Sequence, residues 1–138
     1  MVARLNFRRS SEGGVHLECA GFDVLQLRID WAVTFVMGDQ ERSLEVRVEG
    51  PFELRTAGAV TRIRPEGDAV DLAPVLGLVR QSVENVDVFR EGLLVIGFGC
   101  GATLSVLAGD GFEAWQISGQ SGVMFTGDAD GGFVTWGT

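Results

Sequence analysis

Short apolar segments in which every second residue is hydrophobic follow one another along most of the chain. Glycine separates them, and 20 of the 138 residues are glycine. Alternation with period two is typical of strands with one buried face, and a spacing of about ten residues between turn signals predicts antiparallel sheets. The segments are 24–30, 32–37, 43–48, 52–56, 59–64, 84–89, 92–98, 103–108, 112–118, 122–127 and 133–136, with a candidate edge strand at 15–19. The expected fold is mainly β, an antiparallel barrel or a sandwich.

One segment departs from this alternation and predicts an amphipathic helix over about 69–81. Its apolar positions recur at helical spacing; they are Leu72, Val75, Leu76 and Val79. Asp68 or Asp71 is expected to cap the helix, and Pro74 falls in its first turn, where a missing N–H costs little. The helix is expected to pack across an open end of the sheet system.

The length and a hydrophobic content of 46% predict a single domain over 1–138, with 1–13 as the candidate flexible segment. Within it, two similar β units at about 23–64 and 84–127 flank the helix. The matched positions are Leu44 with Leu104, Val46 with Val106, Phe52 with Phe112, and Glu53 with Glu113. In each Phe-Glu pair we expect the phenylalanine in the core and the glutamate on the opposite face, which makes the repeat part of the scaffold.

Charge is unevenly distributed along the chain. The net charge is −8 and all eleven basic residues are arginine, but the last third contains no basic residue. Its acids are Glu91, Asp110, Glu113, Asp128 and Asp130. Such a negative region repels nucleic acid and membranes and attracts a basic partner. The alternative is that these acids serve only solubility.

Trp115 and Ile117 stand out because the matched face of the first unit is polar. If Phe112 and Ala114 face the core, these two side chains point outward. Either the helix or another strand covers them, or they form an aromatic and acidic contact patch. The candidate binding residues are Trp115, Glu113, Ile117, Asp110, Asp128 and Asp130.

Neither of the two glycine-rich motifs that suggest a ligand is complete. The stretch "GFGCGA" (97–102) has the glycine spacing of a dinucleotide-binding loop, but the following "TLSVLA" is a strand pattern where that loop needs a helix. The stretch "GDADGG" (127–132) lacks the spaced terminal glutamate of a calcium loop. We therefore expect no cofactor and no metal.

The nucleophilic and metal-binding residue types are few. Cys19 and Cys100 match no disulfide framework or zinc spacing, and neither has an activating base nearby, so both are expected to be reduced and dispensable. His16 and Glu18 lie on one side of a strand but need ligands from elsewhere to bind a metal. We expect no catalytic residues.

The C-terminal part contains a recognisable pattern: an aromatic-Glu-Ala-Trp sequence (112–115), a glycine-rich turn (119–122), Gly131 with Gly132, and a final Trp136. This pattern resembles an actinobacterial family of small domains of unknown function, over about 23–136. Ser121 and Asp130 stand where that family tends to have proline, and Phe112 replaces a common tyrosine. Some members resemble immunity proteins of toxin systems, which implies a protein partner.

Charge and resemblance together predict a non-enzymatic protein-binding module. The sharper expectation is a cytoplasmic immunity-type protein that neutralises a basic toxin through its acidic face, with no nucleic-acid or membrane partner. No apolar run follows Arg8 and Arg9, so we expect no signal peptide. The alternative is a β domain that forms a homodimer or binds a small molecule, and an enzyme is the third possibility.

Overall fold

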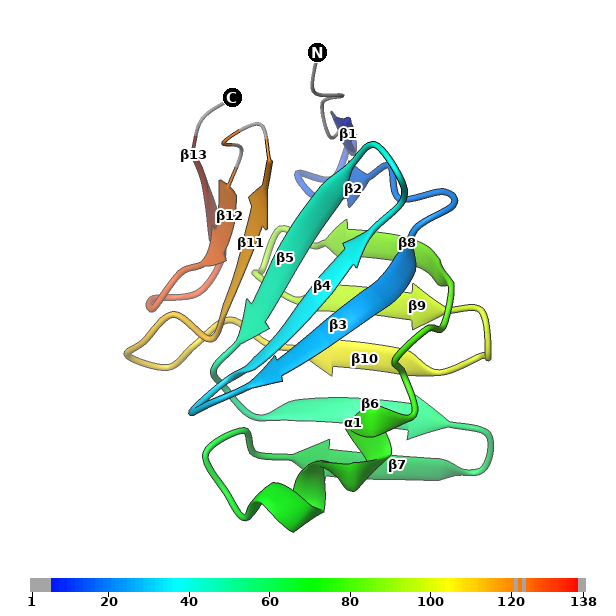
Figure 1. Ribbon diagram of the computed structural model, residues 1–138. Coiled ribbons are helices and arrows are strands. Elements are labelled where there is room, and N and C mark those ends of the chain that lie inside the picture. The colour runs from blue at the N-terminus through cyan, green and yellow to red at the C-terminus, as the bar shows by residue number, and fades with distance from the viewer. Residues whose placement is uncertain (1–5, 121, 123, 137–138) are drawn as a thin grey trace.

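The computed structural model describes residues 6–120, 122 and 124–136, and it shows two antiparallel sheets packed face to face (Figure 1). The seven-stranded sheet has the order β1 (Phe7–Arg9), β2 (Val15–Leu17), β8 (Val83–Val88), β9 (Leu94–Phe98), β10 (Thr103–Val106), β6 (Phe52–Thr56) and β7 (Ala59–Ile63). The six-stranded sheet has the order β13 (Phe133–Trp136), β12 (Met124–Gly127), β11 (Trp115–Gly119), β5 (Ser43–Val48), β4 (Val33–Gly38) and β3 (Asp23–Ile29). The mainly β prediction is confirmed, and of its two forms the sandwich is the right one.

Alternate residues of the strands meet between the sheets and form the core. In β5 the side chains of Leu44, Val46 and Val48 are buried and the intervening ones are half-buried. The same alternation in β10 buries Leu104 and Val106. Each fully buried aliphatic side chain contributes about 1.5–3 kcal/mol, so the pattern that predicts the strands also accounts for how the sheets stay together.

The two units have the same strand order, and each completes the sheet of the other. In the first unit β3, β4 and β5 form a meander, and the chain then crosses to the opposite sheet, where β6 pairs with β10. In the second unit β8, β9 and β10 form the meander, and β11 crosses back to pair with β5. Both meanders have a register shift in their first strand, at Val24/Gln26 and at Val83/Asn85. A common origin of the two units stays a prediction.

Strand register shows where the two units differ. Leu44 pairs with Gly119, whereas its counterpart Leu104 pairs with Leu54. Leu54 therefore corresponds to Gly119. A gapless match of the two units would align it with Ala114, five residues earlier. The difference arises in the segments that cross between the sheets, because 107–114 is longer than 49–51.

This longer crossing segment overturns the predicted role of the second Phe-Glu pair. Phe52 is buried at the start of β6, as expected, but Phe112 lies in the crossing segment and is 44% exposed. By register the structural counterpart of Phe52 is Ile117. The strand predicted over 112–118 begins only at Trp115. Its inward-facing residues are therefore the odd-numbered ones, and the prediction that the even-numbered ones face the core was wrong.

The N-terminal strands also differ from expectation. The segment predicted as an edge strand is β2, which lies inside the sheet because β1 pairs with its other side. Residues 7–9, within the candidate flexible segment 1–13, thus form a strand. Residues 1–5 of that segment lie outside the described residues.

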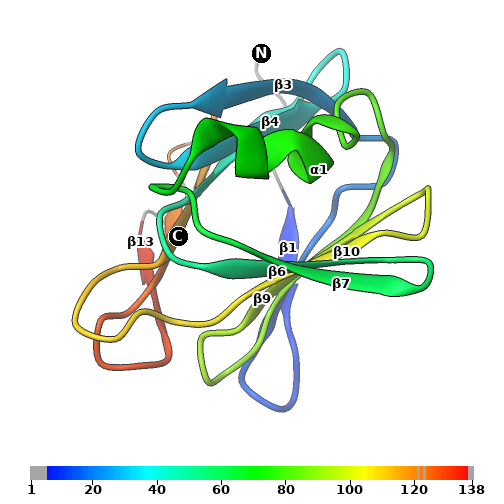
Figure 2. The same cartoon turned by 90° about the horizontal axis from the view of Figure 1, so that it is seen from below.

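The helical segment is shorter than predicted. A 3₁₀ helix (Ala69–Leu72) leads into one turn of α1 (Ala73–Leu76), and Asp68 makes no side-chain capping hydrogen bond. The buried positions are Leu72, Val75 and Leu78, while Leu76 is exposed. Figure 2 shows the helix between β3 and the β6–β7 hairpin. The predicted position at an open end of the sheets is therefore right, and the predicted length is wrong.

The two cysteines have different environments and are expected to react differently. Cys19 is buried and Cys100 is exposed, and both are free. Burial raises the pKa of the Cys19 thiol to about 12, so at neutral pH it lacks the thiolate that reacts. We expect Ellman's reagent to titrate one thiol in the native protein and both in denaturant, with Cys100→Ser removing the native signal. Two fast-reacting thiols in the native state would contradict this assignment.

Candidate functional site

Trp115 is fully buried beneath one end of the sandwich. Its indole Nε1 donates a hydrogen bond to the carbonyl oxygen of Gly92 at 2.9 Å. A Cβ on Gly127 would lie 2.6 Å from the same nitrogen, so this position has room only for glycine. Ile117, the next inward residue of β11, is also fully buried. The expectation that Trp115 and Ile117 form an exposed binding surface is therefore wrong, because both face the opposite sheet.

Three connections between strands meet above Trp115. They are 89–93, 107–114 and 128–132. The N–H of Gly111 donates to the carbonyl of Ala129 at 3.1 Å, and the N–H of Gly132 donates to the carbonyl of Glu91 at 3.0 Å. These bonds join the connections to one another, and the Trp115 bond to Gly92 joins them to the core. We call the three connections the acidic loop end.

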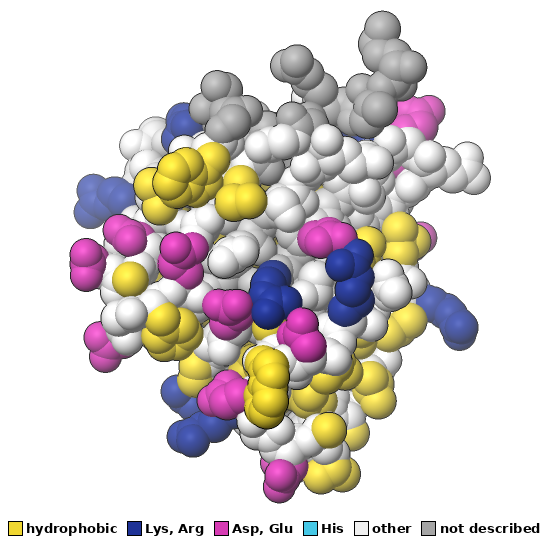
Figure 3. All heavy atoms as spheres, turned by 60° about the vertical axis from the view of Figure 1, so that its left-hand side comes forward, with side chains coloured by type: hydrophobic (Ala, Val, Ile, Leu, Met, Phe, Trp, Pro, Cys, Tyr) yellow, Lys and Arg dark blue, Asp and Glu magenta, His cyan; other side chains and the backbone are white. Residues whose placement is uncertain are grey.

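The acidic loop end gathers the carboxylates of the last third of the chain. They are Glu91, Asp110, Glu113, Asp128 and Asp130. Among the residues that the structure describes, none of the five forms an ion pair. Figure 3 shows acidic side chains around exposed hydrophobic ones on this side of the molecule. The three bonded connections thus carry all five predicted acids and one base, Arg90, while Trp115 is not among their exposed apolar side chains.

The outer face of β3 to β5 has a different electrostatic character. Arg47 contacts Asp30 at 3.2 Å and Glu49 at 3.1 Å. The N–H of Ala32 and the Arg47 guanidinium hold the pKa of Asp30 below its usual value. Carboxylates on this face are therefore neutralised locally, as is typical of a solvated sheet surface, whereas those of the acidic loop end are not.

A cavity of about 550 Å³ lies between the start of β6 and the crossing segment 107–114. The first Phe-Glu pair and Phe112 of the second both line it, together with Arg62 of β7 and Asp110. Residues from both copies of the motif, which were matched in sequence as equivalent scaffold positions, thus line one cavity. Sequence reasoning missed this cavity because it depends on the length of the crossing segment.

Exposed apolar side chains continue outward from this cavity. Phe112 is 44% exposed and Leu107 is 68% exposed, and both line the cavity. A Cβ on Gly50 would lie 2.9 Å from Cβ of Ala114 and 3.4 Å from Cζ of Phe112. Glycine at position 50 therefore lets the Phe112 ring pack closely on the chain, which fixes this wall of the cavity.

A second cavity, of about 460 Å³, contains His16 and Asp87. Nδ1 of His16 lies 2.6 Å from Oδ1 of Asp87, and Nδ2 of Asn85 donates to Oδ2 of Asp87 at 2.9 Å. Because an ionised carboxylate only accepts hydrogen bonds, Nδ1 of His16 is the donor. Sequence reasoning paired His16 with Glu18 instead, because its true partner is 71 residues away. Across the described residues, no three His, Cys, Asp or Glu side chains are grouped to hold a metal.

The fold and the site define a small two-sheet sandwich domain with an acidic end made of three connections. The chain belongs to DUF6188, a family of unknown function whose family model matches residues 15–137. No curated protein and no solved structure matches it. Membership in a family of unknown function is thus confirmed, while an actinobacterial origin and a likeness to immunity proteins stay predictions.

The C-terminal pattern behind the resemblance has a structural explanation at several positions. Ala114 and Trp115 are buried, and the carbonyl of Ala114 accepts the N–H groups of Glu49 and Gly50. Gly131 has φ +93°, in the left-handed region that favours glycine. Ser121 lies outside the described residues.

In the part of the chain that is described, no helix is both long enough and apolar enough to cross a membrane.

Proposed function

We propose that the chain is a non-enzymatic module that binds a basic protein partner through the acidic loop end. The observation that supports this proposal is the convergence of unpaired carboxylates from three separate connections. Like charges gathered at one end of a molecule raise the local negative potential and speed the encounter with a cationic surface. Exposed Phe112 and Leu107 supply the apolar centre that protein interfaces surround with a polar rim.

The sharper form of the proposal is a cytoplasmic immunity-type protein that neutralises a basic toxin. Neutralisation requires tight binding and no chemistry by the module itself. In this form Phe112 takes the anchoring role that Trp115 cannot fill, and Asp110, Glu113, Asp128 and Asp130 steer the toxin from the rim.

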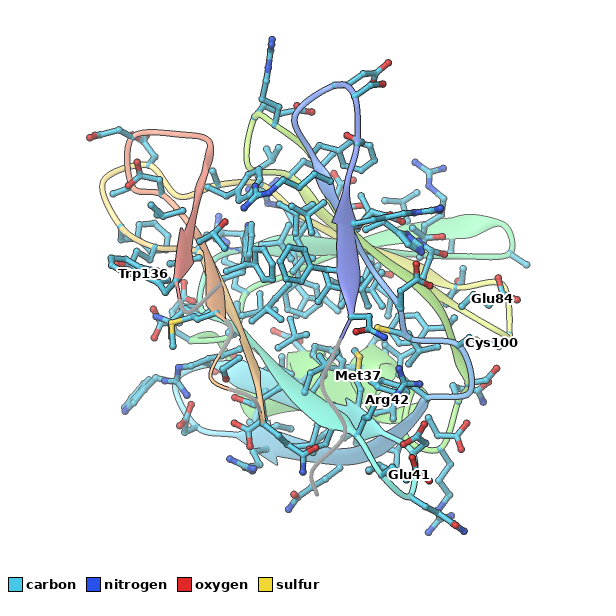
Figure 4. All side chains as sticks on the ribbon, turned by 90° about the horizontal axis from the view of Figure 1, so that it is seen from above. Met37, Glu41, Arg42, Glu84, Cys100 and Trp136 are labelled. Atoms are coloured by element: carbon cyan, nitrogen blue, oxygen red, sulfur yellow. The ribbon has the colours of Figure 1, made fainter. Side chains whose placement is uncertain are left out.

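Charge variants test the proposal. The immunity form requires a basic protein encoded beside this gene, and that protein serves as the partner. Glu91→Gln with Glu113→Gln removes two charges from the acidic loop end, and Glu41→Gln with Glu84→Gln removes two elsewhere. Figure 4 shows Glu41 and Glu84 away from the connections 107–114 and 128–132. We expect the first pair to slow association about threefold to tenfold at low salt, and the second to have little effect. Stopped-flow mixing measures both.

Salt provides the control, because added ions screen exposed charges and should remove the difference between the two double variants. Equal slowing by both would contradict a localised binding surface. Failure of the adjacent basic protein to bind at all would contradict the immunity form.

The alternative is self-association along the edge strand β13. Val134 and Trp136 of that strand are exposed, and an exposed apolar edge can pair with a second chain. Light scattering distinguishes the two functions: a doubled mass without any partner favours the dimer.

A further inference from the structure

We propose that the cavity between β6 and the crossing segment 107–114 receives an apolar side chain that stands beside an arginine or lysine in the partner. This inference rests on the proposed function, because 107–114 forms both the cavity wall and part of the acidic loop end. The partner must then present one bulky hydrophobic residue with a neighbouring cation.

The walls of the cavity suit a bulky apolar side chain, and its volume leaves room for the residues beside that side chain. Its volume of about 550 Å³ falls within the range of about 300–1,000 Å³ in which proteins enclose ligands. Its apolar lining includes Pro51, Leu93, Leu107 and Phe112. An aromatic ring placed there would lie against aliphatic and aromatic groups, which favours burial of its apolar surface.

The wall formed by the crossing segment is held in place by the chain itself. A Cβ on Gly109 would overlap the carbonyl oxygen of Phe112, so the backbone turns tightly at this point. The N–H of Gly111 is bonded to Ala129, and Phe112 packs beside Gly50. A wall that is already ordered costs little further conformational entropy when a ligand enters.

The polar groups of the cavity leave a net negative charge. Glu53 and Arg62 are cross-strand neighbours in register on β6 and β7, so their charges offset one another. Asp110, on the other wall, forms no ion pair with any described residue. A cation next to the inserted side chain would therefore be attracted to Asp110 and to the other acids of the loop end.

A polypeptide fits this surface better than a free small molecule. Leu107 lines the cavity but is 68% exposed, so its hydrophobic surface extends beyond the enclosed volume. A molecule that only filled the cavity would leave that surface in water, whereas a chain passing over the rim would also cover it.

Short peptides test the inference directly. The probes are the capped peptides Arg-Trp-Arg, Arg-Ala-Arg and Glu-Trp-Glu, together with N-acetyltryptophanamide, titrated into ¹⁵N-labelled protein. We expect Arg-Trp-Arg to shift the amide signals of 105–114 with a dissociation constant on the order of 1 mM. Each of the other probes lacks one required element and should bind at least about tenfold more weakly.

A filling variant supplies the matched control. Ser105 lines the cavity from the outward face of β10, and Thr103 lies on the same face of that strand without lining the cavity. Ser105→Phe should abolish the shifts, whereas Thr103→Phe should leave them. A native-like spectrum of Ser105→Phe shows that it still folds. If it does not fold, Ser105→Val is used, and binding should then weaken by about threefold or more.

The outcomes separate this inference from the function on which it rests. Equal binding of N-acetyltryptophanamide and Arg-Trp-Arg would overturn the cation requirement and make the cavity a small-molecule site. Shifts confined to residues that do not line the cavity, or no shifts, would overturn the inference entirely. If Ser105→Phe leaves partner binding unchanged while Glu91→Gln with Glu113→Gln slows it, only this inference fails. If neither variant changes partner binding, the proposed function fails.

Discussion

Replacement of Trp115 by alanine is expected to lower the free energy of unfolding by about 3–5 kcal/mol, the usual cost of removing a large buried aromatic side chain. The indole is fully buried, and its N–H donates to Gly92 in the connection 89–93. Its removal leaves a void under the acidic loop end and breaks the bond that joins that end to the core. Equilibrium urea unfolding measures the change.

Trp115→Phe is the control for the hydrogen bond alone. It keeps most of the apolar volume but leaves the Gly92 carbonyl without this donor, which we expect to cost about 1–3 kcal/mol. A loss below about 1 kcal/mol for Trp115→Ala would show that the loops do not depend on the indole.

The second large effect is a contrast between the two phenylalanines of the repeated pair. Phe52→Ala should destabilise by about 3–5 kcal/mol because the ring is buried in the core. Phe112→Ala should cost only about 1 kcal/mol or less, because nearly half of that side chain is already in water. The same urea titrations compare the two variants.

The glutamates of the pair are the control for this contrast. Glu53 and Glu113 are both exposed, so replacing either by glutamine should change stability by no more than about 0.5 kcal/mol. Equal losses for Phe52→Ala and Phe112→Ala would contradict the register that places Phe112 outside the core.

Strands such as β5 and β10 were predictable because buried residues alternate with more exposed ones, and the β5 pattern shows how directly this alternation becomes a core. The segment 112–118 shows why alternation alone does not fix which residues face the core. Phe112 and Ala114 form one apolar set, Trp115 and Ile117 form another, and period two alone does not choose between them. The choice depends on where the chain finishes crossing between the sheets, which is a property of the whole fold.

The candidate site was predictable in charge but not in shape. The absence of bases after residue 90 identified the acids, and the topology then brought three connections together. The cavity and the pairing of His16 with Asp87 each need two segments far apart in the chain. No local pattern in the sequence indicates such a meeting.

The exchange of strands between the two units has a consequence for synthesis. When the ribosome has produced the chain only as far as β7, neither β5 nor β6 has its partner in the other unit, since β11 and β10 do not yet exist. The hydrogen-bonding edges of β5 and β6 stay open during that interval, as does that of β2, whose partner β8 is also still to be made, and such edges can pair with other nascent chains. The late pairings also join distant residues, which slows folding. We therefore expect these edges to be sites of aggregation while the protein is still being made.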